Sequence, residues 1–519
     1  MSGNADSARE RVIVLDFGSQ YNQLIARRVR QLGVYCEILP NTTSADELER
    51  RRPQALIFSG GPASVGEPGA PTVAAEVLAM GVPVLGICYG MQLLAGMLGG
   101  QVVKAEAREY GPAVLNVDEP GKLLAGCGTD LDIWMSHGDQ VKRLPEGFRK
   151  LAHTSTCPVA AMGDAKRRIY GVQFHPEVVH TPCGPQVFRN FLFSIAGCRG
   201  GWTMAGFAEE AVGKIRQQVG EDGVICALSG GVDSTVVAAL LNRAVGKRAA
   251  CVFVDNGLLR QQEAERVCRF FREEYPVNFR FVDASAKFLA ALKGVTDPEV
   301  KRKAIGKMFI RVFREEAQRI GGLRFLAQGT LYPDVIESQS AYGGPSVTIK
   351  SHHNVGGLPE DLGFELVEPL RELFKDEVRL LGRELGLPEE VLTRQPFPGP
   401  GLAVRIVGEV TQERLAVLRE ADARVLEELE RYEGFGDIWQ SFAVLLPVKT
   451  VGVMGDERTY ANVVALRIVS STDGMTSDWV RVPYEVLGRI SNRIINEVRG
   501  VNRVVYDISP KPPSTIEWE

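Results

Sequence analysis

A cysteine at a predicted sharp turn is the first residue whose type and setting point to chemistry. In "VPVLGICYGMQLL", Cys88 stands between an apolar run and a helical pattern and is flanked by Gly86 and Gly90. Small flanking residues permit the strand–turn–helix bend that exposes a nucleophile, and a helix N-terminus stabilises a thiolate. The pattern alone fits a catalytic nucleophile and a buried structural cysteine equally well. A neighbouring base would favour the nucleophile.

A histidine with an acidic neighbour supplies that base. The apolar run in "IYGVQFHPEV" predicts a strand that ends in His175, Pro176 and Glu177. Residues two apart on an extended chain point to the same side, so Glu177 can orient the ring while the ring serves Cys88. A cysteine, a histidine base and an acidic residue form an acyl-transfer set.

A glycine pair offers the third part of such a site. In "FSGGPASV", Gly60 and Gly61 let main-chain N–H groups approach a developing oxyanion, together with the N–H of Tyr89. A plain turn is the alternative for a glycine pair taken alone.

These three motifs together resemble class I (triad) glutamine amidotransferases. The resemblance implies that Cys88 attacks the side-chain amide of glutamine, releases ammonia and forms a thioester that water hydrolyses. It also implies that glutamine is held by Gln92 and by residues of "MSHGD", namely Ser136, His137 and Asp139.

A second turn, in "VICALSGGVDSTVVAALL", predicts a phosphate site without a lysine. Between a predicted strand and helix it offers hydroxyl and N–H groups, from Ser229, Gly230, Gly231, Val232, Asp233, Ser234 and Thr235. Amides at a helix N-terminus bind an anion without a lysine, whereas a Walker A loop needs its lysine for γ-phosphate chemistry. The absence of that lysine argues against a kinase. The turn resembles the SGGxDS loop of ATP pyrophosphatases, which hold the β,γ-pyrophosphate as a leaving group.

A carboxylate among phosphates requires an explanation, and Asp233 has two. A bridging Mg²⁺ would reconcile Asp233 with phosphate, since this ion prefers hard oxygen ligands; an N-terminal helix cap is the alternative. By resemblance, Val254 and Asp255 in "VFVDNGLLR" lie near the adenosine of ATP, and Lys350 in "IKSHHN" is a candidate contact for an ATP phosphate.

Cations at an unfavourable helix end suggest another anion site. "DPEVKRKAIGKMF" predicts a helix with Asp297 as cap and Pro298 at its first position, followed at once by residues 301–303. Cations there oppose the helix dipole unless an anion binds, although a solvated face is the alternative. The tail "ISPKPPSTIEWE" predicts a stiff, docked segment that aims Lys511 and Glu517 at a ligand.

The elements that position these motifs form three blocks. Apolar strands ending in glycine turns alternate with helical patterns twice, which predicts two successive doubly wound α/β domains, followed by a smaller α+β domain. A glycine cluster at 198–206 and a proline–glycine segment at 394–405 mark the boundaries. We therefore expect domains at 1–200, 201–395 and 396–519.

Composition narrows the class of protein. The 519 residues are 45% hydrophobic and 24% charged, with a net charge of −4, so no basic footprint for nucleic acid is present. We find no signal peptide pattern and no apolar run of membrane-spanning length. The nine cysteines contain no CxxC pair, which indicates reduced thiols. Together these features predict a cytoplasmic protein without a membrane partner.

Along its whole length the chain resembles the glutamine-hydrolysing GMP synthetase family, through "KRKAIG", "IKSHHNVGGLP", "QPFPGPGLAVR" and "KPPSTIEWE". The resemblance implies ATP- and Mg²⁺-dependent amination of xanthosine 5′-monophosphate (XMP) to GMP through an adenylated intermediate. It also implies XMP binding by Arg302, Lys511 and Glu517, and a homodimer formed by the last domain.

Rival functions are weaker. A glutamine-dependent NAD synthetase usually carries a Glu–Lys–Cys amidase, and an RNA-thiolating enzyme would want a basic surface. A non-catalytic nucleotide-binding scaffold would not need an intact Cys88, His175 and Glu177.

Overall fold

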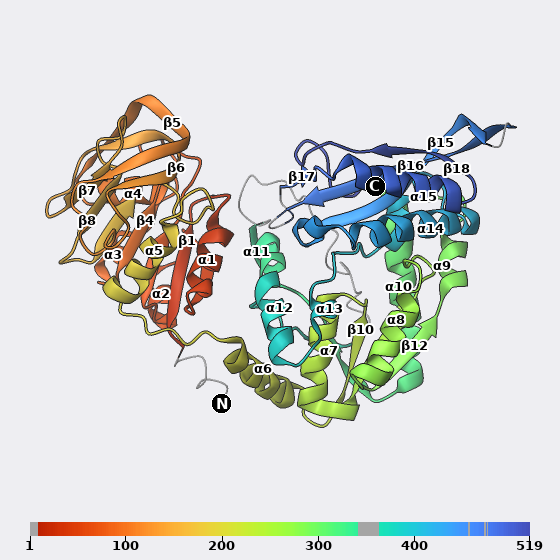
Figure 1. Ribbon diagram of the computed structural model, residues 1–519. Helices are drawn as coiled ribbons and strands as arrows, with labels where there is room; N and C mark the ends of the chain where they lie inside the picture. Colours follow the sequence, from red (N-terminus) through yellow and green to blue (C-terminus); the bar gives the residue numbers. More distant parts are fainter. Residues whose placement is uncertain (1–8, 341–362, 455–456, 472–473, 475) are drawn as a thin grey trace. The chain divides into compact units, whose positions relative to one another are not determined.

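The computed structural model describes residues 9–340, 363–454, 457–471, 474 and 476–519, and these form two compact units. One unit is built on the chain up to Gly206, and the other begins at Phe207. Figure 1 shows the elements of each unit.

The first unit contains a nine-stranded sheet in the order β2-β1-β3-β4-β9-β8-β7-β5-β6. The strands from β2 to β9 along this order are parallel, and the remaining neighbours pair antiparallel. The strands are β1 (Arg11–Asp16), β2 (Tyr35–Pro40), β3 (Ala55–Phe58), β4 (Val84–Ile87), β5 (Gln101–Val117), β6 (Asp130–Arg143), β7 (Arg149–His153), β8 (Ala161–Asp164) and β9 (Ile169–Val172).

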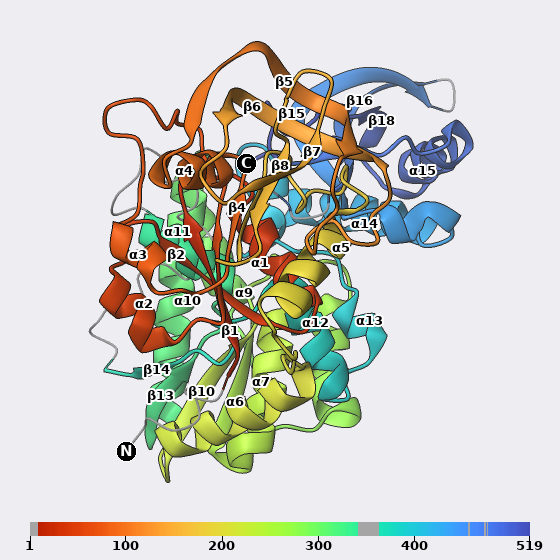
Figure 2. The same cartoon turned by 90° about the vertical axis from the view of Figure 1, so that its left-hand side faces the viewer.

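Helices cover the parallel part of this sheet. They are α1 (Asn22–Gln31), α2 (Ala45–Arg51), α3 (Ala75–Ala79), α4 (Tyr89–Met97) and α5 (Gly184–Arg189), and a π-helix follows at Asn190–Ile195. Buried residues of α2, α3 and α4 share one core with Ile13 and Leu15 of β1. Helix α1 contacts α5, next to which it lies in Figure 2. Because β1 is apolar at four consecutive positions, from Val12 to Leu15, it is suited to burial on both faces.

The second unit opens with a fully parallel five-stranded sheet in the order β12-β11-β10-β13-β14. Its strands are β10 (Gly223–Leu228), β11 (Ala249–Asp255), β12 (Phe279–Asp283), β13 (Leu323–Ala327) and β14 (Glu365–Val367). The helices formed by residues 204–392 are α6 (Met204–Val219), α7 (Val232–Val245), α8 (Glu263–Arg269), α9 (Ser285–Leu292), α10 (Pro298–Ile320), α11 (Tyr332–Ser340), α12 (Lys375–Glu384) and α13 (Glu389–Leu392).

The C-terminal part of the same unit adds a four-stranded sheet. Strand β16 (Glu457–Ser470) pairs antiparallel with β15 (Gln440–Met454) and β17 (Asp478–Trp479), and parallel with β18 (Val501–Tyr506). Helices α14 (Gln412–Leu429) and α15 (Tyr484–Glu497) pack together beside it. One apolar core runs from Ile225 and Val252 of the five-stranded sheet to Val464 of the four-stranded sheet.

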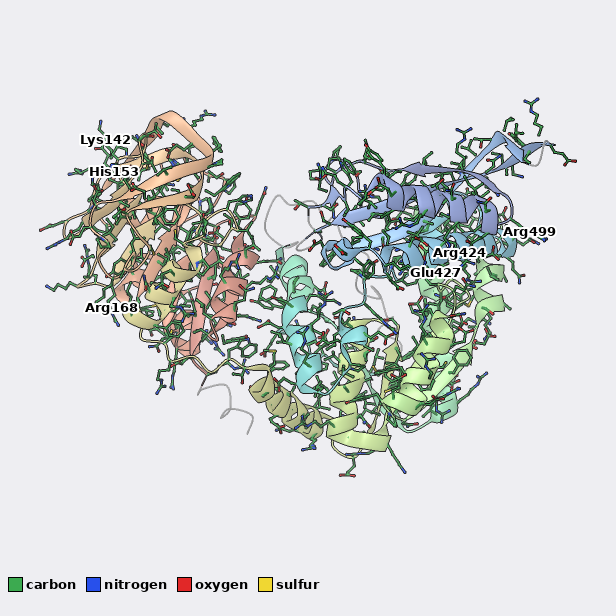
Figure 3. All side chains as sticks on the ribbon, in the orientation of Figure 1. Lys142, His153, Arg168, Arg424, Glu427 and Arg499 are labelled. Carbon is green, nitrogen blue, oxygen red and sulfur yellow. The ribbon has the colours of Figure 1, made fainter. Side chains whose placement is uncertain are left out.

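Ion pairs connect α14 to α15. Arg424 and Glu427, labelled in Figure 3, lie 2.8 Å apart on α14, and Arg493 of α15 reaches Glu427 at 2.7 Å. Their side chains are only partly exposed, so this network is less screened than an isolated surface pair.

The fold prediction is confirmed: two α/β sheets of doubly wound type precede a smaller α+β part. None of the described helices is long and apolar enough to cross a membrane. The predicted domain limits at residues 200 and 395 stay predictions.

Candidate functional site

Tight backbone packing builds the turn that carries Cys88. A Cβ atom on Gly90 would lie 2.3 Å from the carbonyl oxygen of Phe58, and one on Gly86 would lie 2.6 Å from the backbone of Gly90. Glycine is therefore the residue that fits at both positions. Cys88 itself has φ 51° and ψ −107° at the N-terminus of α4, a conformation that non-glycine residues rarely adopt. Strain of this kind is typical of a functional residue.

His175 lies beside both predicted partners of the triad. Its Nδ1 is 2.7 Å from Oε1 of Glu177, and all three side chains are at least 95% buried. Burial alone would lower the pKa of His175, but the Glu177 carboxylate and a hydrogen bond to Cys88 raise it from its usual 6.5 to about 11. The site therefore holds a protonated imidazole beside the sulfur at neutral pH.

The contact between His175 and Glu177 arises differently from what the sequence predicts. Strand β9 ends at Val172, and Pro176 and Glu177 lie in a turn. The side-to-side alternation of a strand therefore does not align the two residues, and that part of the prediction is wrong. The turn is fixed instead by Thr181, whose hydroxyl donates to the His175 carbonyl at 2.8 Å.

The glycine loop lies against the triad. A Cβ atom on Gly60 would lie 3.3 Å from Cε1 of His175 and 3.8 Å from Cβ of Cys88, so this residue borders the reacting groups. Only glycine fits at position 61, because a Cβ atom there would lie 2.5 Å from the carbonyl oxygen of Phe17. Among the described residues the main-chain N–H of Tyr89 has no hydrogen-bond partner, as at the first turn of any helix.

Two of the residues predicted to hold glutamine contact the main-chain carbonyl of a third. The Asp139 carbonyl lies 2.8 Å from Nε2 of Gln92 and 2.9 Å from Nδ1 of His137. The Ser136 carbonyl, on the same strand β6, lies 3.5 Å from the sulfur of Cys88. Gln92 of α4 thus ties that helix to β6, whereas the His137 contact lies within β6 itself.

Three residues of this network were missed in the sequence. Nε2 of Gln173 lies 3.6 Å from the Cys88 sulfur, and its Oε1 accepts from Gln92 at 3.2 Å. A glutamine inside the apolar run "IYGVQF" is a usable signal, since a buried amide needs partners. Glu109, 2.9 Å from His137 Nε2, and Ser64, which donates to the Asp139 carboxylate, come from other segments and leave no local signal.

One trio of metal-type ligands occurs among the residues that the structure describes. The side chains of Glu109, His137 and Cys157 bring ligand atoms within 4.8 Å of one another. Both ring nitrogens of His137 already have protein partners, and burial together with Glu109 raises the pKa of Cys157 to about 12. This arrangement favours a role in holding β6 over metal binding.

The phosphate turn has the predicted strand–turn–helix form. Gly231 is the N-cap of α7, and Gly230 has a φ of +77°, which suits glycine. The hydroxyls of Ser229 and Ser234 lie 3.1 Å apart, and Thr235 donates to the Gly231 carbonyl at 2.8 Å. Val232, at the first helical position, is buried in the core.

A lysine is present after all, supplied by a distant segment. Nζ of Lys375, at the start of α12, lies 2.6 Å and 2.5 Å from the two carboxylate oxygens of Asp233. Gly231 caps α7, so the alternative of Asp233 as the N-cap is wrong. The carboxylate instead sits at the mouth of the turn, neutralised by an ammonium group.

The next strand end lies beside this turn in the sheet. Val254 is almost fully buried, so its side chain belongs to the core, and Asp255 accepts from the N–H of Gly257 at 2.8 Å. Strand β11 pairs with β10 in parallel, which places both strand ends at one edge of the sheet. Lys350 lies outside the described residues.

The start of α10 meets the C-terminal tail. Asp297 caps the helix by accepting from Val300 at 2.9 Å, as predicted. Lys301 is fully buried; it donates to the Ile406 carbonyl at 2.7 Å and bonds the Glu519 carboxylate. Arg302 donates to a main-chain oxygen of Glu519. The tail thus supplies an anion for the first cation of this helix, so the solvated-face alternative is wrong for Lys301.

The tail is docked, as predicted, and both of its candidate ligands have protein partners. Glu517 accepts from Arg405 at 2.9 Å and 3.1 Å and from Gln440 at 2.8 Å. Lys511 donates to the Gly474 carbonyl at 2.8 Å, and its main chain pairs with Ser477. Arg467, buried under the tail, donates to the carbonyls of Ser509 and Thr515.

Three family models match separate segments of the chain. The class-I glutamine amidotransferase family matches residues 13–195, the NAD synthase family matches 207–301 and the GMP synthase C terminal domain matches 427–518.

Full-length relatives agree with these matches. GMP synthase (glutamine-hydrolyzing) of Carboxydothermus hydrogenoformans is 58% identical over 98% of this chain and 99% of its own. The enzyme of that name from Clostridium perfringens is 56% identical over 98% of this chain and 100% of its own, and that of Nitratidesulfovibrio vulgaris is 58% identical over 99% and 100%. A chain that joins this buried cysteine triad to a phosphate turn without the Walker lysine, at such identity over its whole length, belongs to the glutamine-hydrolysing GMP synthase family.

Proposed function

We propose that this protein converts XMP to GMP with ammonia that it releases from glutamine, and that ATP is cleaved to AMP and pyrophosphate. The observation that carries this proposal is the presence, in one chain 56–58% identical to GMP synthases, of a Cys–His–Glu set and a phosphate turn lacking the Walker lysine. One site makes ammonia and the other consumes it.

At the first site, the sulfur of Cys88, whose proton His175 holds, attacks the side-chain amide carbon of glutamine. The protonated His175, oriented by Glu177, donates its proton to the leaving ammonia and then accepts one from the water that hydrolyses the thioester. The N–H groups of Tyr89 and of the Gly60–Gly61 loop stabilise the oxyanion. Gln92, Ser136, His137 and Asp139 form the wall against which glutamine is held.

At the second site, the turn from Ser229 to Thr235 holds the β,γ-pyrophosphate of ATP, and Val254 and Asp255 border the adenosine. The XMP oxygen attacks the α-phosphorus and pyrophosphate leaves, so the purine C2 carries a good leaving group. Ammonia then displaces AMP. Arg302, Lys511 and Glu517 bind XMP, and Lys350 contacts an ATP phosphate.

Mg²⁺ fits this site by donor chemistry. Asp233 offers a carboxylate at the mouth of the turn with 30% of its side chain exposed, and one or two carboxylates plus phosphates are the usual protein-side ligands of this ion. When bound, Mg²⁺ neutralises charge on the pyrophosphate. Lys375, which now balances Asp233, would then have its ammonium group available for a phosphate oxygen.

Analysis of the nucleotide products tests this function. With XMP, ATP and glutamine as substrates, we expect GMP, AMP and pyrophosphate to form in equal amounts. Chromatography measures the two nucleotides, and a coupled assay measures the pyrophosphate. ADP and phosphate as the products would contradict the proposal, because the outer phosphate would then be the group transferred.

An exposed apolar patch supports a homodimer through the C-terminal part. Val451 of β15 pairs with Tyr460 of β16, so both side chains lie on one face of the sheet, and Val453 is two residues further along that face. Tyr460 is 70% exposed and Val453 75%. A second copy of the chain would bury this patch. The proposal also keeps the three predicted domains and a cytoplasmic location.

A further inference from the structure

An arginine outside every predicted ATP segment touches the phosphate turn. Arg394 follows α13, and its Nη1 donates to the carbonyl of Gly230 at 3.0 Å. A Cβ atom on Gly230 would lie 2.8 Å from Val267 of α8 and 4.0 Å from Nη1 of Arg394. Gly230 is therefore enclosed between these two side chains.

The geometry of a peptide unit gives this contact a consequence for the turn. The Gly230 carbonyl and the Gly231 N–H belong to one planar trans peptide, so they point in opposite directions. A donor that fixes the carbonyl also fixes where the N–H points. Gly231 is the N-cap of α7, directly before the amides that bind an anion at a helix N-terminus.

The charge of Arg394 is not committed to a carboxylate. Within the part of the chain that the structure describes, the Gly230 carbonyl is its hydrogen-bond partner and it forms no salt bridge. Lys375, by contrast, is paired with Asp233. Among the described residues, Arg394 is thus a cation beside the turn with no carboxylate at ion-pair distance. Glu263, Glu390 and Glu274 act on it only from further away, so it adds positive potential where a polyphosphate would bind.

The neighbouring residues anchor Arg394 to the four-stranded sheet. Oε1 of Gln395 accepts from both the N–H and the hydroxyl of Ser441 on β15, each at 3.0 Å. An arginine of the C-terminal part holds the adjacent turn in the same way, since Arg419 of α14 donates to the carbonyls of Leu259, at 2.9 Å, and Gly257. The turns after β10 and β11 are thus both held through main-chain carbonyls.

We propose that Arg394 is a positioning residue of the phosphate turn, which orients the Gly230–Gly231 peptide and supplies positive charge for the pyrophosphate of ATP. This inference rests on the proposed function of the turn. It predicts a defect in binding ATP and pyrophosphate, with XMP binding preserved.

The test compares Arg394→Ala, Arg394→Gln and Arg394→Lys in the full-length protein, with free ammonia as nitrogen donor. We expect Arg394→Ala to raise the KM for ATP and the inhibition constant of inorganic pyrophosphate about tenfold or more, the effect of losing one charge-assisted hydrogen bond. The KM for XMP should change less than about twofold. Arg394→Lys should restore much of the loss, because it keeps the charge and a donor, and Arg394→Gln should restore less.

Arg216→Gln is the matched control. Arg216 donates to the carbonyls of Ala244, at 3.0 Å, and Arg243, at 2.9 Å, at the opposite end of the same helix α7. Its loss removes arginine–carbonyl bonds from α7 without touching the turn, so both ATP and pyrophosphate constants should stay unchanged.

Unchanged constants in folded Arg394→Ala, or an equal shift in Arg216→Gln, would overturn the inference. If Arg394→Ala does not fold, the KM for ATP and the pyrophosphate inhibition constant of Arg394→Lys and Arg394→Gln provide the test. Equal values for these two variants and the parent protein would overturn the inference. Failure of the parent protein to release pyrophosphate would instead overturn the proposed function, and it would be seen before any variant is made.

Discussion

At the scale of single residues, the proton on His175 determines what the first site can do. Glu177 and Cys88 keep the ring protonated despite burial, so the ring can give a proton to departing ammonia. The second site contains neither of these groups. The two chemistries therefore depend on different side chains, and one can be removed without the other.

Replacement of Cys88 by Ala should separate them. We expect no glutamine-dependent GMP formation, because no thioester can form, and near-parental GMP formation with ammonium chloride. Both rates are measured by the absorbance change on XMP amination. A variant that is also inactive with high ammonia would show that the nucleophile serves both reactions.

The pH dependence of glutamine hydrolysis should report the Glu177 carboxylate. The raised pKa of about 11 means that the imidazolium is retained as pH rises from about 7 to 9, whereas an ordinary histidine with pKa 6.5 is neutral there. Parental kcat/KM should change little over this range. In Glu177→Gln the pKa falls, so activity should be lower and should decline further with rising pH.

Glutamate release at each pH provides the measurement, and Asp118→Asn is the control. Asp118, directly after β5, has a carboxylate oxygen 2.9 Å from Nδ1 of His153 at the end of β7, and both side chains are partly exposed (His153 is labelled in Figure 3). Its removal should leave the profile unchanged. Parallel profiles for the parent and Glu177→Gln would contradict the assigned role of Glu177.

The residues that sequence reasoning found are those that a short motif contains. Cys88, His175 and the glycine loop carry their chemistry within a few positions, because a turn between a strand and a helix is local. Lys375 is 142 residues from Asp233, and Glu109 is 28 residues from His137. No periodicity or turn signal links such pairs, since the fold alone brings them together.

At the scale of elements, α4 and β4 can approach because two glycines leave room. Gly90→Ala should force a Cβ atom into the Phe58 carbonyl and destabilise the first unit by about 1–3 kcal/mol. We expect a lower thermal midpoint by calorimetry and loss of glutamine hydrolysis, with ammonia-dependent activity retained.

Gly96→Ala is the control on the same helix. A Cβ there would lie 3.4 Å from Val65, in ordinary contact, and alanine favours a helix more than glycine does. Its thermal midpoint should be equal or higher. A loss as large as that in Gly90→Ala would mean that close packing at the turn is not the cause.

Element boundaries followed the sequence where glycine, proline or a cap ends a pattern. Asp297 and Pro298 start α10 as predicted, and Gly321 follows its end. Strand β9 ended before its apolar pattern did, because the chain turns at residues 173–177 to bring His175 to Cys88. The burial of Lys301 could not be predicted either, since its partner Glu519 is distant in sequence.

At the scale of the whole molecule, the exposed patch on β15 and β16 should control association. Tyr460→Glu would place a charge in the proposed interface, where an unpaired carboxylate is costly to bury. We expect the mass in solution to fall from that of a dimer to that of a monomer, measured by light scattering after gel filtration.

The control is Tyr110→Glu on β5, since Tyr110 is 67% exposed and Tyr460 is 70%. This variant should keep the parental mass. A monomeric parent protein, or dissociation by both variants, would contradict an interface on the C-terminal sheet.

The arginine contacts on the two nucleotide turns bear on how this enzyme could be cut and recombined. A fragment ending at residue 395 would keep Arg394 but lose Ser441, which anchors the adjoining Gln395, and would lose Arg419 entirely. Such an excised ATP-cleaving module would retain its sheet and its diagnostic loop sequence while both loops lost their supports. The smallest fragment that keeps these supports therefore extends past α14 into the four-stranded sheet. Chimeras joined at residue 395 would contain the loop motif without the contacts that hold it in place.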